Sequence, residues 1–345
     1  MQWLRRSPAA ALAVALALHT SGLVAAKPAL AASDLASVPA PGRIVQVEGR
    51  QVHIHCTGVG SPTVLLEEGL GGSSLNWAWV QRDVTKVSRV CSYDRPGYGW
   101  SDPADTPMDA ADTSRQLYAL LQAANEKGPY IAVGHSLGGA YMRLFATEHL
   151  KDVAGLVLVD ATHPSVLTAS AEGGPPPVDR QKGTLIANFL TSNDIIWRAA
   201  IGLRIVKTSY DDSWKNLPPD VTAAMAAYIV DRRNVRTFLK ENESVPDTLA
   251  QIASLDGLRN LPVIVISSDK VKAPDPTTAM ERAEWNKNLQ RKWLAISTNS
   301  HFLIIPGADH MSLLFDPQHA GQVSKVIVNM VVAVRGKRRA HTEVQ

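Results

Sequence analysis

Apolar residues alternate with polar ones in some stretches of the chain and form unbroken runs in others. Two alternating stretches, 43–48 and 51–56, flank Gly49-Arg50 and predict a β-hairpin. Four short runs predict further strands: 63–66, 89–93, 130–133 and 154–159. The run 154–159 has no polar alternation, which is typical of a parallel strand covered on both faces.

Helical spacing of apolar residues separates these predicted strands. The predicted helices of the first half are 76–86, 112–125 and 137–149. The alternation stops over 161–260, where the patterns are mostly helical. It resumes with a strand at 262–266, a helix at 278–294, a strand at 301–305 and a helix at 318–334.

This order predicts an α/β fold with a mostly parallel sheet and helices on both faces. The interruption predicts an inserted helical cap of about 100 residues, the size of a small domain. We therefore expect a core made of 33–160 and 261–345, with the cap formed by 161–260.

The first 32 residues have the pattern of a secretory signal peptide. Arg5-Arg6 precedes an apolar stretch from Ala9 to Leu18, and small residues follow before position 32. An uncleaved anchor is the alternative, but His19-Thr20-Ser21 interrupts the apolar run well before the ~20 residues that a bilayer span needs. We expect a secreted or periplasmic protein with no stable membrane span after signal removal.

Composition excludes several classes of protein. The 345 residues are 45% hydrophobic and 19% charged, which is too apolar for a disordered chain. Three of the 35 basic residues lie in 1–32, and the remaining 32 equal the 32 acidic ones. A neutral mature chain does not suggest nucleic-acid binding, and the oligomeric state stays open.

The segment Gly134-His135-Ser136-Leu137-Gly138 has the pattern G-x-S-x-G, and it lies between a predicted strand and a predicted helix. A serine on such a tight turn is pushed out of the sheet, and the small flanking glycines leave room for it. Ser136 is therefore the candidate nucleophile, and we expect His135 to pack beside it.

A serine hydroxyl is a weak nucleophile that needs a general base. His310 follows the last predicted strand across a turn that contains Gly307, so it is the candidate base. His301 lies at the opposite end of that strand.

These features, with the segments 67–74 and 93–102, resemble the serine-nucleophile, esterase- and lipase-like members of the α/β-hydrolase superfamily. The resemblance covers the chain outside the signal and the cap. It implies an eight-stranded, mostly parallel sheet, but it says little about the substrate.

The resemblance also implies an oxyanion hole made by the backbone N–H groups of Leu70 and Leu137. Many members of the superfamily carry histidine where this chain has Glu68. Whether Glu68 orients the loop or lies outside the site is left open by the sequence.

The resemblance leaves two candidates for the triad acid. Asp160 ends the predicted sixth strand, a position used by some relatives. Asp269 follows the seventh strand, where the acid is more common, but the usual G-x-x-D spacing would fall near Lys270 or Val271. The interpretation favours Asp160, with Asp269 as the alternative.

Other polar residues suggest structural roles. The pair Asp94-Arg95 is interpreted as a tie between loops. Cys56 and Cys91, on strands that are antiparallel neighbours in the implied fold, either form a disulfide or pack as two thiols. No metal or organic cofactor is implied.

The expected activity is cleavage of a carboxylic ester of a small molecule through a Ser-His-Asp triad and an acyl-enzyme intermediate. Amidase, lactonase, thioesterase and cofactor-free haloperoxidase chemistry are alternatives. A hydrolase fold that binds ligands without turnover is the non-enzymatic alternative.

Overall fold

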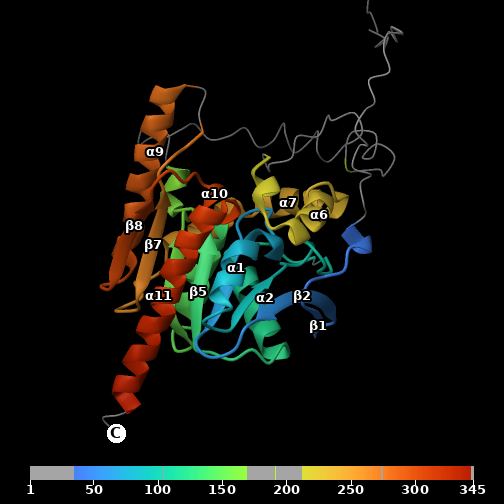
Figure 1. The fold of residues 1–345 in the computed structure, drawn as a ribbon, viewed down its shortest axis with the longest axis horizontal. Coiled ribbons are helices and arrows are strands. Elements are labelled where there is room, and N and C mark those ends of the chain that lie inside the picture. The colour runs from blue at the N-terminus through green and yellow to red at the C-terminus, as the bar shows by residue number, and fades with distance from the viewer. Residues whose placement is uncertain (1–34, 104, 169–190, 192–211, 273–274, 343–345) are drawn as a thin grey trace, which may run out of the picture. The chain divides into compact units, whose positions relative to one another are not determined.

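The computed structural model describes residues 35–103, 105–168, 191, 212–272 and 275–342 (Figure 1). The expected signal peptide and residues 169–190 and 192–211 of the expected cap lie outside these ranges. The chain divides into two units, Met1–Ala31 and Ala32–Gln345. The description below concerns the second unit only.

An eight-stranded sheet forms the centre of this unit, in the order β1-β2-β4-β3-β5-β6-β7-β8. The strands are β1 (Arg43–Val47), β2 (Arg50–Thr57), β3 (Thr63–Glu67), β4 (Val90–Tyr93), β5 (Tyr130–His135), β6 (Val153–Val159), β7 (Val263–Ser268) and β8 (Ser300–Ile305). Strand β2 pairs antiparallel with β1 and β4, and all other neighbours are parallel. The predicted α/β-hydrolase fold is confirmed.

The described α-helices are α1 (Ala78–Val84), α2 (Ala110–Ala123), α3 (Leu137–Glu148), α6 (Pro219–Tyr228), α7 (Arg232–Glu243), α8 (Val245–Ala253), α9 (Pro276–Arg291), α10 (Ser312–Phe315) and α11 (Pro317–Thr342). Short 3₁₀ helices are η1 (Leu35–Ser37), η2 (Ser74–Trp77), η3 (Pro164–Leu167), η5 (Asp212–Asn216) and η6 (Lys292–Ile296). None of the helices in the described ranges is long and apolar enough to cross a membrane.

Hydrophobic cores cover both faces of the sheet. Leu156 and Leu158 of β6 point into a core shared with α2, α3 and α8. The intervening Val157 and Val159 point into a second core, shared with α1 and α11. Because successive side chains of a strand face opposite ways, β6 needs apolar residues at every position, as its sequence predicted.

The part of 161–260 that the structure describes is helical. Helix α8 packs against α2 and α3 in the core through Val245, Leu249 and Ile252. Helices α6 and α7 lie together at one side of the sheet (Figure 1). The cap boundaries of 161 and 260 stay a prediction, although α8 packs as a core helix.

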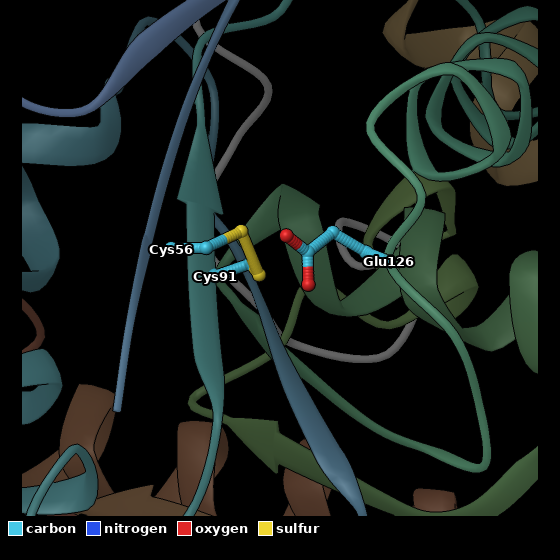
Figure 2. A group of neighbouring side chains, drawn as sticks. All are labelled: Cys56, Cys91 and Glu126. Atoms are coloured by element: carbon cyan, nitrogen blue, oxygen red, sulfur yellow. A yellow bond between two sulfur atoms is a disulfide. The ribbon is translucent and has the colours of Figure 1, made fainter. Parts of the chain in front are cut away.

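Cys56 and Cys91 face each other in the register between β2 and β4 and form a disulfide. Figure 2 shows the Glu126 carboxylate pointing towards this bond. The three side chains lie close enough to suggest a metal site. The disulfide removes both thiolates as ligands, however, and Glu126 instead pairs with Arg89, with an N–O distance of 2.6 Å.

We predict that the Cys56→Ser variant is less stable than the wild type by about 3 kcal/mol. The bond closes a loop with a sequence separation of 35 residues, and the cost reflects the chain entropy that the unfolded state regains. Urea unfolding measures the difference. A wild-type protein whose thiols react with iodoacetamide after denaturation without reductant would contradict the disulfide.

Candidate functional site

Ser136 stands on a tight turn between β5 and α3. Its backbone has φ 54° and ψ −125°, a region that non-glycine residues rarely adopt. A Cβ placed on Gly134 would lie 2.3 Å from the Gly138 carbonyl oxygen, so the turn closes only with glycine there. The Ser136 N–H donates to the Val159 carbonyl oxygen at 3.0 Å, which ties the turn to the end of β6.

The side chain of His310 forms a hydrogen bond with Asp160. Nδ1 of His310 lies 2.7 Å from Oδ2 of Asp160. Asp160 also accepts hydrogen bonds from the Ser268 backbone N–H at 3.1 Å, the Ser268 hydroxyl at 3.0 Å and the Asn286 amide at 2.9 Å. An ionised Asp160 would fix the proton on Nδ1 of His310 and leave Nε2 free to accept one.

Burial by itself would raise the pKa of Asp160. The hydrogen bonds from His310, Ser268 and Asn286 and the nearby imidazole outweigh burial and lower this pKa to about 2. Asp160 is therefore a carboxylate at neutral pH.

Asp269, the second candidate acid, has a different contact. Its Oδ2 accepts the backbone N–H of Gly307 at 3.2 Å. Asp269 therefore braces the turn before His310, while Asp160 is the candidate that bonds to the His310 ring.

His135 connects the turn that carries Ser136 to the loop that carries His310. Its Nε2 lies 3.0 Å from the His310 carbonyl oxygen, and the two imidazole rings have centroids 4.5 Å apart. Because His135 directly precedes Ser136, this contact brings Ser136 and His310 to the same edge of the sheet.

The loop after β3 packs against Ser136. A Cβ placed on Gly69 would lie 2.7 Å from Cβ of Ser136, so this approach requires glycine. Leu70 follows in the same loop. Leu137 is the first residue of α3, where backbone N–H groups have no acceptor within the helix.

The structure also gives Glu68 a partner. Its Oε1 lies 2.8 Å from Nδ1 of His135, and both side chains are buried. Of the two interpretations left open by the sequence, this contact matches a residue that orients the loop.

A buried cluster of charges around Arg95 also holds this loop. Nη1 of Arg95 lies 2.6 Å from Oε1 of Glu67, and Nη2 lies 2.9 Å from Oε1 of Glu241. The guanidinium also donates to the carbonyl oxygens of Glu68 at 2.6 Å and Gly69 at 2.7 Å. Burial raises the pKa of Glu67 to about 7, against the opposing effect of Arg95.

Glu241 comes from helix α7, within the expected cap. Its carboxylate accepts the Gly71 backbone N–H at 3.0 Å and the hydroxyls of Tyr98 at 2.6 Å and Tyr141 at 3.0 Å. Arg95 therefore does tie loops together, as predicted. Nothing in the local sequence distinguishes Glu241, because α7 is strongly polar and its buried Glu241 is preceded and followed by the same kinds of residue as its exposed Glu243.

A cavity of about 360 Å³ adjoins His310. The residues that line it are Asp160, Ser268, Lys270, Val271, Lys272, Arg282, Trp285, Asn286, Asp309, His310 and Met311. About 43% of the His310 side chain is exposed, so solvent reaches the imidazole.

Comparison with protein families gives one match over most of the chain. The model described as "Alpha/beta hydrolase family" matches residues 51–324. An uncharacterized vacuolar membrane protein of Saccharomyces cerevisiae (strain YJM789) is 37% identical over 110 residues, 31% of this chain. The match covers 17% of that protein's length.

Solved structures share the fold at low sequence identity. A thermophilic esterase from Thermogutta terrifontis is 18% identical with a TM-score of 0.57, and the match covers 85% of this chain and 98% of the esterase. The Cif epoxide hydrolase from Acinetobacter nosocomialis is 17% identical with a TM-score of 0.63, covering 84% and 88%. At these identities the similarity shows the fold alone.

We predict that Glu241→Gln lowers the free energy of unfolding by about 3 kcal/mol, because it leaves Arg95 buried with one fewer anionic partner. Glu243→Gln, at an exposed position of the same helix, is the matched control and should change stability by less than about 0.5 kcal/mol. Urea unfolding measures both. If Glu241→Gln lowered the free energy of unfolding no more than Glu243→Gln does, the buried ion pair would contribute no stability.

Proposed function

Because the chain belongs to the alpha/beta hydrolase family, we propose that it is a serine hydrolase that cleaves a carboxylic ester of a small molecule. The proposal assigns Ser136 as nucleophile, His310 as general base and Asp160 as the acid that orients His310. The backbone N–H groups of Leu70 and Leu137 are the proposed oxyanion hole.

In the proposed reaction, Nε2 of His310 removes the hydroxyl proton of Ser136 as the oxygen attacks the ester carbonyl carbon. The two backbone N–H groups stabilise the negative charge that develops on the carbonyl oxygen, each contributing about 3 kcal/mol. His310 then protonates the departing alcohol. A water molecule that gives its proton to His310 hydrolyses the acyl-enzyme, and the exposed face of His310 gives water access for this step.

The observation that carries the proposal is the 2.7 Å hydrogen bond between His310 and a carboxylate that stays ionised at neutral pH. This bond presents Nε2 as the free acceptor of the imidazole. The hydrogen bond lies at the same sheet edge as Ser136, which has a positive φ and stands at the N-terminus of α3. A serine that only completed a turn would need neither feature.

The alternatives differ in how well they fit. One epoxide hydrolase shares this fold. Epoxide hydrolysis by an aspartate nucleophile is nevertheless disfavoured for this chain, because position 136 is a serine. Amides, lactones and thioesters are attacked at the same carbonyl carbon, so they remain second candidates.

We also propose that the protein is secreted or periplasmic. Two observations support an oxidising environment outside the cytosol: the Cys56–Cys91 disulfide and the signal-peptide pattern of residues 1–32.

A fluorophosphonate probe should label the wild-type protein at Ser136. The Ser136→Ala variant should lose both labelling and hydrolysis of p-nitrophenyl acetate with little change in melting temperature, because it removes only the nucleophile. Peptide mass spectrometry locates the label. A folded wild-type protein that stays unlabelled would favour the non-enzymatic alternative, a ligand-binding protein.

Asp160→Asn should lower kcat for the same ester by about 10⁴-fold, the loss seen when a triad acid is neutralised in a serine protease. Asp269→Asn should stay within about tenfold of the wild type, because Asp269 bonds to backbone rather than to the His310 ring. Steady-state kinetics of both variants decide. A larger loss for Asp269→Asn would reverse the assignment.

A further inference from the structure

Both ring nitrogens of His135 contact oxygen atoms. Nδ1 lies 2.8 Å from Oε1 of Glu68, and Nε2 lies 3.0 Å from the His310 carbonyl oxygen. A carbonyl oxygen can only accept a hydrogen bond, so Nε2 must carry a proton. Nδ1 faces a carboxyl group, which accepts when it is ionised.

A neutral imidazole has one N–H, and these two contacts call for two donors if Glu68 is a carboxylate. The side chain is buried, with 2% of its surface exposed, so bulk water does not compete with either partner. Burial alone would lower the pKa of His135, but the Glu68 carboxylate and the neighbouring Asp160 outweigh it and raise this pKa.

We propose that His135 is a doubly protonated imidazolium, paired with Glu68, and that this pair is a positioning device for the general base His310. This inference rests on the proposed function. The pair is a second carboxylate–histidine unit, connected to the proposed Ser136–His310–Asp160 triad through the His310 carbonyl oxygen. It differs from that triad because its histidine donates from both nitrogens and transfers no proton.

The physical effect of the pair is to fix the backbone of the loop that carries His310. Asp160 holds the His310 side chain through Nδ1, while His135 holds its main chain through the carbonyl oxygen. A hydrogen bond from a charged donor is about twice as strong as a neutral one. The position of Nε2 of His310 relative to Ser136 therefore depends on the charge of His135.

Glu68 also links this pair to the proposed oxyanion hole. Its carbonyl oxygen accepts from Arg95, and its side chain bonds to His135. Among the described residues, Glu68 after β3 and His310 after β8 contact His135, and Asp160 after β6 acts on it through its charge. Two of these three are acidic, which favours a cation at His135.

The protonation state can be measured directly by ¹⁵N NMR of wild-type protein labelled at histidine, with the His135 signals identified by their absence in His135→Gln. At pH 7.5 we expect both nitrogens of His135 to show the shifts of an imidazolium. Glu68→Gln should convert His135 to the neutral form protonated on Nε2. A neutral His135 in the wild type would overturn the proposal.

Kinetics test the positioning role. Glu68→Gln and His135→Gln should each lower kcat for p-nitrophenyl acetate by about 10- to 100-fold, the loss of one charge-assisted hydrogen bond, with KM within about twofold. The double variant should lose no more than the worse single variant, because the residues act as a unit. Exposed Glu284→Gln and His301→Gln are the matched controls and should match the wild type.

These results separate this inference from the proposed function. Absence of fluorophosphonate labelling in folded wild-type protein would contradict the hydrolase assignment, whatever the NMR shows. Normal labelling with an unchanged kcat in Glu68→Gln would contradict the positioning role alone. Should Glu68→Gln fail to fold, the wild-type NMR measurement still decides the charge of His135.

Discussion

The parallel register of the central strands is the constraint on which the site depends. In the register, His135 at the end of β5 lies opposite Val159 of β6, and Ser268 of β7 lies opposite Ile305 of β8. Val159 in turn lies opposite Ile266 of β7. All four strands therefore end at one edge, so the residues that follow them meet there although they are far apart in sequence. The hydrogen bond between Asp160 and His310 joins two such strand ends across a sequence separation of 150 residues.

Buried charges then give this edge a specific geometry. An unpaired charge in a protein interior is costly, so each buried ion restricts its neighbours to arrangements that supply a partner. Arg95 accordingly lies between Glu67 and Glu241. The loop that follows β3 is held by Arg95 through its main-chain carbonyl oxygens and by His135 through the Glu68 side chain. Because Glu241 belongs to α7, the position of that helix and the shape of the loop depend on each other.

Local sequence was enough to predict the sheet and to select two candidate site residues, Ser136 and His310. An apolar run of strand length, a glycine-flanked serine and a following helix specify the turn at Ser136 through steric requirements that act within a few residues. His310 could be selected because it follows a predicted strand across a glycine turn. Cys56 and Cys91 could be placed on neighbouring strands, yet whether they bonded depended on a register that short-range pattern does not fix.

The sequence by itself determined the order of strands and helices, the identity of the candidate nucleophile and a short choice of acids. Only the tertiary structure distinguished the contacts of Asp160 from those of Asp269, paired Glu68 with His135 and brought Glu241 into the core. The physical reason is that periodicity reports which residues are apolar, whereas the partner of a buried charge is set by three-dimensional packing between segments distant in the chain. A polar helix such as α7 shows no local sign of the one carboxylate that packing removes from water.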